Sequence, residues 1–171
     1  IKGAKLLEAS TGAPLRVMAD NMKNITENAI SMKEALQLTT LASSAGLSNK
    51  EIQELTKGAK GASIALGRDM SDSITRVIRG VTKLEPELLD ELGIMVRVDK
   101  AAADYARTLG KSASSLTDFE RRQAFATAVL KQGEDKFKAI DIDANPYTKL
   151  LASFTNLMLT GGELLNRILG P

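Results

Sequence analysis

Apolar side chains recur every three or four positions along most of the 171-residue chain, which is the spacing of one face of an α-helix. Pro14 stands where the first turn of a helix can begin, and Gly46 is suited to end it in the left-handed conformation. We therefore expect one long amphipathic helix over residues 14–45, after a linker-like lead-in at residues 1–13. Its stripe consists of Met18, Met22, Ile25, Ala29, Met32 and Leu36.

The methionines of this stripe have two interpretations. Met18, Met22 and Met32 are flexible side chains that fill irregular gaps, as they would in the core of this chain. The same face would also suit a seam between this helix and a helix of another subunit. Both interpretations remain open from the sequence.

Residues 47–140 carry the strongest signals for the start of a helix. Ser48 and Glu51 form the pattern of a capping box, in which each side chain accepts a hydrogen bond from the other residue's backbone N–H. Leu47 and Ile52 stand at the positions of a hydrophobic staple. A helix should therefore begin here, and the rest of this region also reads as helical.

Further breaks divide this region. We expect a short helix over residues 85–93, a connection at residues 94–98 and a helix over residues 101–109. Thr117 and Glu120 form a second capping box before a long helix. Within the helix that follows Ser48, three glycines indicate either close approach of a neighbouring backbone or a bent or broken helix: Gly58, Gly61 and Gly67.

The C-terminal residues 146–171 have the broadest apolar stripe. Asn145 can cap a helix that begins at Pro146, and a stripe this wide must be buried against this chain or another. Together with the first stripe it gives a candidate helix-packing or partner interface. The candidate residues are Met18, Met22, Ile25, Met32, Leu36, Leu150, Phe154, Leu157, Leu164 and Ile168.

Composition limits the chemistry. The chain has no Cys and no His, which excludes thiol nucleophiles, zinc fingers and histidine acid–base catalysis. Its 23 basic and 21 acidic residues give a net charge of +2, which argues against a dedicated nucleic-acid binder. We expect no enzyme activity, no cofactor and no metal site.

The few motifs with possible chemistry favour structural interpretations. Gly110-Lys111-Ser112 resembles the end of a phosphate-binding loop, but Tyr105 stands where that loop needs a glycine. The acidic residues of 85–91 alternate with leucines and are expected on the wet face of a helix. The arginine pairs Arg76/Arg79 and Arg121/Arg122 are expected to make local ion pairs or to lie on the surface.

Several blocks of the chain stand in a characteristic order. The blocks are residues 51–69, RGVTKLEPELLDELGI at 79–94, SSLTDFERRQAF at 114–125, residues 133–137, and the Asn145-Pro146-Tyr147 and 164–171 segments. These blocks resemble bacteriophage and prophage tail tape measure proteins. The likeness covers roughly residues 40–171, and the order of the blocks is its specific feature.

The resemblance implies a structural role in a phage tail. Tape measure proteins are long helical chains whose length sets tail length; they contact tail tube and tail tip or baseplate proteins, and they leave the tube when DNA is ejected. The resemblance also implies a homo-oligomer, with three copies favoured, and location in the tail lumen or tip of the virion after assembly in the bacterial cytoplasm. Transient contact with DNA in the tube, and with the host membrane on ejection, are part of the same picture.

The expected fold is all-α: amphipathic helices with glycine and proline breaks, in an extended bundle completed by other copies or by tail proteins. A continuous helix of the whole chain would be about 260 Å long, and Pro86 and Pro146 oppose such a rod. Because the chain starts at Ile1 rather than at a methionine, we expect it to be an internal segment of a longer polypeptide.

Two other classes of function remain. One is a generic helical scaffold or adaptor, since residues 14–45 alone carry no family signal. The other is a membrane-active helical protein in which residues 146–169 lie on a bilayer. No uninterrupted apolar run of about 20 residues exists to span one.

Overall fold

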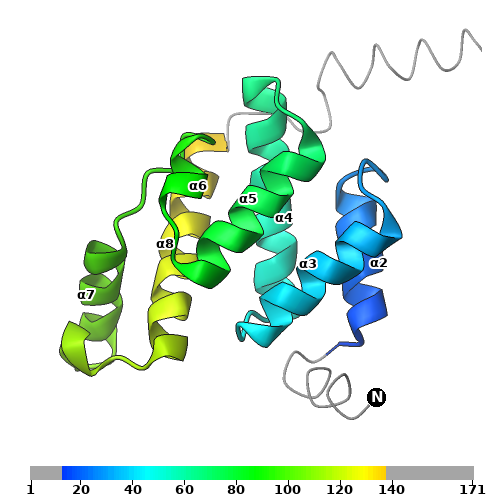
Figure 1. The fold of residues 1–171 in the computed structure, drawn as a ribbon. Helices are drawn as coiled ribbons and strands as arrows, with labels where there is room; N and C mark the ends of the chain where they lie inside the picture. Colours follow the sequence, from blue (N-terminus) through cyan, green and yellow to red (C-terminus); the bar gives the residue numbers. More distant parts are fainter. Residues whose placement is uncertain (1–12, 138–171) are drawn as a thin grey trace, which may run out of the picture. The chain divides into compact units, whose positions relative to one another are not determined.

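The computed structural model describes residues 13–137, and all regular structure in that part of the chain is helical. Backbone contacts divide the chain into two units, Ile1–Ala139 and Ile140–Pro171, and the described residues belong to the first. The helices are α2 (Leu15–Ile25), α3 (Met32–Ser44), α4 (Asn49–Leu66), α5 (Met70–Lys83), α6 (Glu87–Asp90), α7 (Val98–Thr108) and α8 (Asp118–Phe137), with a 3₁₀ turn η1 at Ala113–Ser115 (Figure 1). The expected all-α class is confirmed for these residues.

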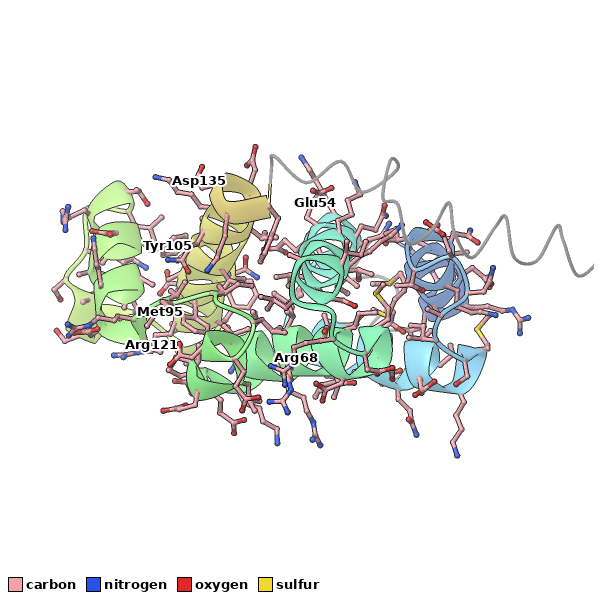
Figure 2. All side chains as sticks on the ribbon, turned by 90° about the horizontal axis from the view of Figure 1, so that it is seen from above. Glu54, Arg68, Met95, Tyr105, Arg121 and Asp135 are labelled. Carbon is pink, nitrogen blue, oxygen red and sulfur yellow. The ribbon has the colours of Figure 1, made fainter. Side chains whose placement is uncertain are left out.

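The helices form two layers. α7, α8, α4 and α2 lie side by side in one row, and α5 and α3 lie across the row on one side of it (Figures 1 and 2). α5 contacts both α4 and α8, and α3 contacts both α2 and α4, so the second layer ties neighbouring helices of the first together. α7 packs on α8 and η1 at one end of the row.

The core lies between the two layers. Phe125 of α8 is its largest fully buried side chain. Val129 and Phe137 of the same helix are also buried. The other large side chains with less than 2% of their surface exposed are Met18, Met22, Leu47, Ile52, Leu55, Ile74, Ile78, Leu89, Leu92, Ile94 and Val77.

The prediction of one long helix over residues 14–45 is wrong, because a turn at residues 26–31 separates α2 from α3. Glu27 and Asn28 adopt positive φ angles of 53° and 63°, which reverse the chain. Ser31 then starts α3 with a capping box: Glu34 N–H donates to Ser31 Oγ (3.2 Å) and Ser31 N–H donates to Glu34 Oε2 (2.9 Å). This local cap competes with a continuous helix, and the turn also buries Ile30.

The capping box predicted at Ser48 is confirmed. Glu51 N–H donates to Ser48 Oγ (3.3 Å), and Ser48 N–H donates to Glu51 Oε2 (2.7 Å). Leu47 and Ile52 are each 1% exposed, as the hydrophobic staple requires. The backbone groups at the start of α4 are therefore satisfied locally.

Replacing Ser48 with alanine is expected to lower the free energy of unfolding by about 1 kcal/mol, because Ser48 Oγ is the acceptor for the Glu51 N–H. Ser44→Ala is the matched control, since Ser44 Oγ donates to the Thr40 carbonyl inside an exposed helix turn. The control should change stability by less than about 0.5 kcal/mol. Urea unfolding followed by circular dichroism measures both, and equal effects would contradict the role given to the cap.

The other helix boundaries lie within a few residues of their predicted positions. α4 continues through Gly58 and Gly61 and ends at Gly67, which has a positive φ of 63°. The broken-helix alternative is therefore wrong, and a Cβ at Gly58 would meet no atom within 4 Å, so no close approach occurs at that glycine. The helix expected over 85–93 is shorter, at α6, and α7 begins at Val98 rather than at residue 101.

Candidate interaction surfaces

The predicted apolar stripe is divided between the core and the surface. Met18 and Met22 are 1% exposed and lie in the core of this chain, where Met18 Sδ is 3.9 Å from Ser43 Oγ. Core packing is therefore the role of these two methionines in this fold. The other three N-terminal candidates, Ile25, Met32 and Leu36, are partly buried. The C-terminal candidates lie outside the described residues: Leu150, Phe154, Leu157, Leu164 and Ile168.

α3 buries a broader face than the stripe predicts. Ala35, Leu38 and Ala42 are its buried apolar residues, at the spacing of one helix face. Thr39 and Ser43, seven positions after Met32 and Leu36 and on the same side of the helix, are also buried. Met32 and Leu36 themselves keep part of their surface exposed.

The corner between α3 and α4 is held by the first turns of α8. Arg122 Nε donates to the Ala45 carbonyl (3.0 Å), and Gln123 Nε2 donates to the Gly46 carbonyl (3.2 Å). The Phe119 ring lies over Gly46, where a Cβ would stand 2.5 Å from a ring carbon, yet half of the ring remains exposed. Gly46 also has a φ of 90°, so glycine is needed both for the turn and for the ring.

Four charged side chains form a cluster on α5 and the segments beside it. Arg68 contacts Glu91 (3.0 Å) and Asp72 (3.8 Å), while Arg76 contacts Asp72 (2.8 Å) and Glu91 (3.1 Å). The hydrogen bond to Asp72 raises the pKa of the Arg76 guanidinium above its usual value. Each charge faces two opposite charges, so the cluster ties the end of α6 to α5 and Arg68. The expected local pairing of Arg76 is confirmed.

The residues that resemble a phosphate loop have local partners. Gly110 ends α7 with a φ of 64°, and Lys111 Nζ is 2.6 Å from Glu120 Oε1. This contact, with the backbone N–H of Thr117, lowers the pKa of the Glu120 carboxyl. Lys111 therefore pairs with the glutamate of the second capping box, in which Glu120 N–H donates to Thr117 Oγ1 (3.1 Å).

Arg121 donates to the carbonyls of Leu116 and Ala113 at 3.4 Å each, which holds η1 beside the start of α8. Arg121 and Arg122 are thus half-buried and donate to backbone carbonyls, where the sequence predicts local ion pairs or surface positions, and the Ala45 partner of Arg122 lies 77 positions away. The acidic residues Glu85, Glu87 and Asp90 are exposed, as expected for a wet face.

The sequence does not predict the buried position of Lys60. The side chain of Lys60, in the middle of α4, is only 9% exposed, and its Nζ lies 2.6 Å from Glu27 Oε1. Glu27 belongs to the turn between α2 and α3, so this ion pair fastens the turn to α4. The capping box of Ser31 and Glu34 is also tied to α5, because the Ser71 hydroxyl of α5 donates to Glu34 Oε1 (2.9 Å). Hydrogen bonds from the Ser31 hydroxyl, the Ser31 N–H and Ser71 lower the pKa of Glu34.

The surface of the described residues has several exposed apolar side chains and an open groove. No group of three acidic side chains lies close enough together to hold a metal ion within residues 13–137. No helix in this part of the chain has the length and hydropathy to span a membrane. An open groove between α6 and α7 is lined by Pro86, Asp90, Met95, Val96, Arg97, Val98 and Asp99. The large apolar side chains with 44–69% of their surface exposed are Val17, Leu66, Met95, Leu109 and Phe119.

No family model and no solved structure matches this chain. The arrangement of its helices and surfaces therefore has to be interpreted from its own residues.

Proposed function

We propose that this chain is a folded structural segment of a phage tail tape measure protein, which acts in tail assembly and leaves the tail with the DNA. The observation that supports this proposal most is that four of the blocks that resemble this family lie in the same folded unit. Residues 51–69, 79–94, 114–125 and 133–137 occupy α4, the end of α5 with α6, and both ends of α8. These helices contact one another around one core, so the blocks share one folded unit.

The fold favours an assembly section over a stretch of extended ruler. As one continuous helix, residues 13–137 would be about 190 Å long, whereas the 20 residues of α8 are about 30 Å long. A chain folded back into two layers adds little length to a tail. We therefore propose that this segment docks against tail tube or tail tip proteins, as an oligomer in which three copies are favoured.

The proposed role is non-catalytic and needs no cofactor. The polar residues discussed above serve caps, corners and ion pairs, and the exposed apolar side chains are available for other proteins. Location in the tail lumen or tip, contact with DNA during ejection and contact with the host membrane remain parts of the proposal.

An in-frame deletion of residues 48–140 from the parent gene tests this function. The expected result is that no tails form, because the deletion removes five helices, α4 to α8, and leaves only α2 and α3 of the described fold. Tails shortened by up to about 1.5 Å per deleted residue would also support a tape measure, with this segment as part of the ruler. Tail lengths are measured by electron microscopy. Tails of normal number and length would contradict the proposal.

A matched experiment separates the tape measure from a generic helical scaffold. Mass spectrometry of purified wild-type tails should find peptides of this chain as a component of the particle. The double substitution Met95→Ser with Phe119→Ser changes two of the most exposed large apolar side chains, and should reduce the number of tails while the chain stays helical. Absence of the chain from purified tails would favour the scaffold.

A further inference from the structure

The turn between α2 and α3 interrupts a sequence pattern that is continuous. Residues 15–44 contain no glycine and no proline. Their apolar residues keep the alternating spacing of three and four that places them at the core positions of a coiled coil. The seven consecutive core positions are Leu15, Met18, Met22, Ile25, Ala29, Met32 and Leu36.

The turn contains no glycine, the residue that adopts left-handed φ angles most readily. Glu27 and Asn28 both have left-handed φ angles without being glycine, and no other neighbouring pair does so within residues 13–137. Three contacts hold the turn: the Lys60–Glu27 ion pair, the Ser31–Glu34 capping box and the burial of Ile30. The hairpin is thus held by contacts of the turn residues with α4 and with the first turn of α3, and not by glycine at the left-handed positions.

The hairpin also leaves the coiled-coil pattern partly unused. Met18 and Met22 are buried, but Ala29 is exposed, and Met32 and Leu36 are half-buried. The hairpin therefore uses the first half of the pattern fully and the second half only in part. In a single continuous helix all seven positions would lie on one face.

We propose that residues 15–44 are a two-state segment, which is a hairpin in the single chain and opens at residues 26–31 into one continuous helix that pairs with the same helix of other copies. The open helix would be about 45 Å long, and its stripe of 22 residues covers three heptads. Opening breaks the Lys60–Glu27 pair and exposes Ile30, so the hairpin is the resting state. In the open state, Met18 and Met22 leave the core and join the stripe. Packing of this stripe against the same stripe of other copies stabilises the open state.

The distribution of charge fits pairing between identical copies. In the continuous helix the charged side chains fall at the outer heptad positions b and f, away from the seam, with one exception: Lys33 lies at a flanking position, where a parallel copy presents the uncharged Asn28. Like charges therefore do not meet across the seam. The outer charged residues are Arg16, Asp20, Lys23, Glu27 and Glu34.

This inference rests on the proposed self-association and not on the phage tail, and it is tested on the full 171-residue chain in solution. The chain has no cysteine, so Arg16→Cys and Thr40→Cys introduce two exposed sites for spin labels. The labels stand 24 positions apart, about 36 Å along a continuous helix. In the hairpin they are much closer, because Met18 and Ser43 are in contact. We expect a short distance at low concentration, and a second distance near 36 Å that grows with concentration together with the oligomer seen by sedimentation.

Substitutions in the turn and in the seam shift the two states in opposite ways. Asn28→Gly favours the left-handed turn and opposes the helix, so the fraction at the long distance should fall about fivefold. Asn28→Ala should raise it several-fold, and Leu36→Gln should remove both the long distance and the oligomer. If the wild-type chain forms oligomers while its labels stay at the short distance, or never associates at any concentration, the proposal is overturned. These results leave the tail-length experiment unaffected, so the two proposals fail separately.

Discussion

Replacing Phe125 with alanine is expected to lower the free energy of unfolding by about 3–5 kcal/mol. Phe125 is 0% exposed and is the largest fully buried side chain of the described residues. It belongs to α8, which contacts α4, α5 and α7, so the cavity left by the ring would weaken the packing of both layers. Urea unfolding followed by circular dichroism gives the change from the shift in midpoint.

Phe119→Ala is the matched control, because it makes the same chemical change on the same helix. Half of the Phe119 side chain is exposed, so its loss should cost less than about 1 kcal/mol. A loss from Phe119→Ala as large as that from Phe125→Ala would show that the core is not centred on α8.

Signals contained within a few residues allowed accurate prediction. Ser48 with Glu51, and Thr117 with Glu120, form their capping boxes because all the atoms involved lie within one turn of helix. The same signal was present at Ser31 and Glu34 but was outweighed by the apolar spacing, which runs through the turn. The missed helix boundary was therefore readable from the sequence.

Contacts between distant residues account for what the sequence could not predict. Arg122 caps the carbonyl of Ala45, which is 77 positions away, and nothing near either residue indicates this partner. Lys60 would be expected on the surface of α4, yet the turn at Glu27 covers it. The sequence correctly indicates that Met18 and Met22 lie on a packed apolar face. Whether that face packs on this chain or on another depends on where α4 lies. The pattern therefore predicts that these residues are packed, but not which chain covers them.

Two glycine substitutions inside helices are expected to have opposite effects. Gly80 lies in α5, where a Cβ would stand 2.9 Å from Leu89 Cγ and 3.2 Å from the carbonyl oxygen of Glu85. Gly58 lies in α4, where a Cβ would meet nothing within 4 Å. Alanine favours the helix by about 1 kcal/mol at either position, but at Gly80 the crowding costs about 1–3 kcal/mol.

Gly58→Ala should therefore stabilise the protein, and Gly80→Ala should be less stable than Gly58→Ala by about 1–3 kcal/mol. Leu89 is fully buried and the Glu85 carbonyl is backbone, so neither neighbour can move away freely. Because both variants make the same change in a helix interior, the difference between their urea midpoints isolates the contact between α5 and α6. Equal stabilisation by the two alanines would mean that α6 does not pack on Gly80. The Arg68–Glu91 and Arg76–Glu91 ion pairs beside it would then have to hold α6 in place by themselves.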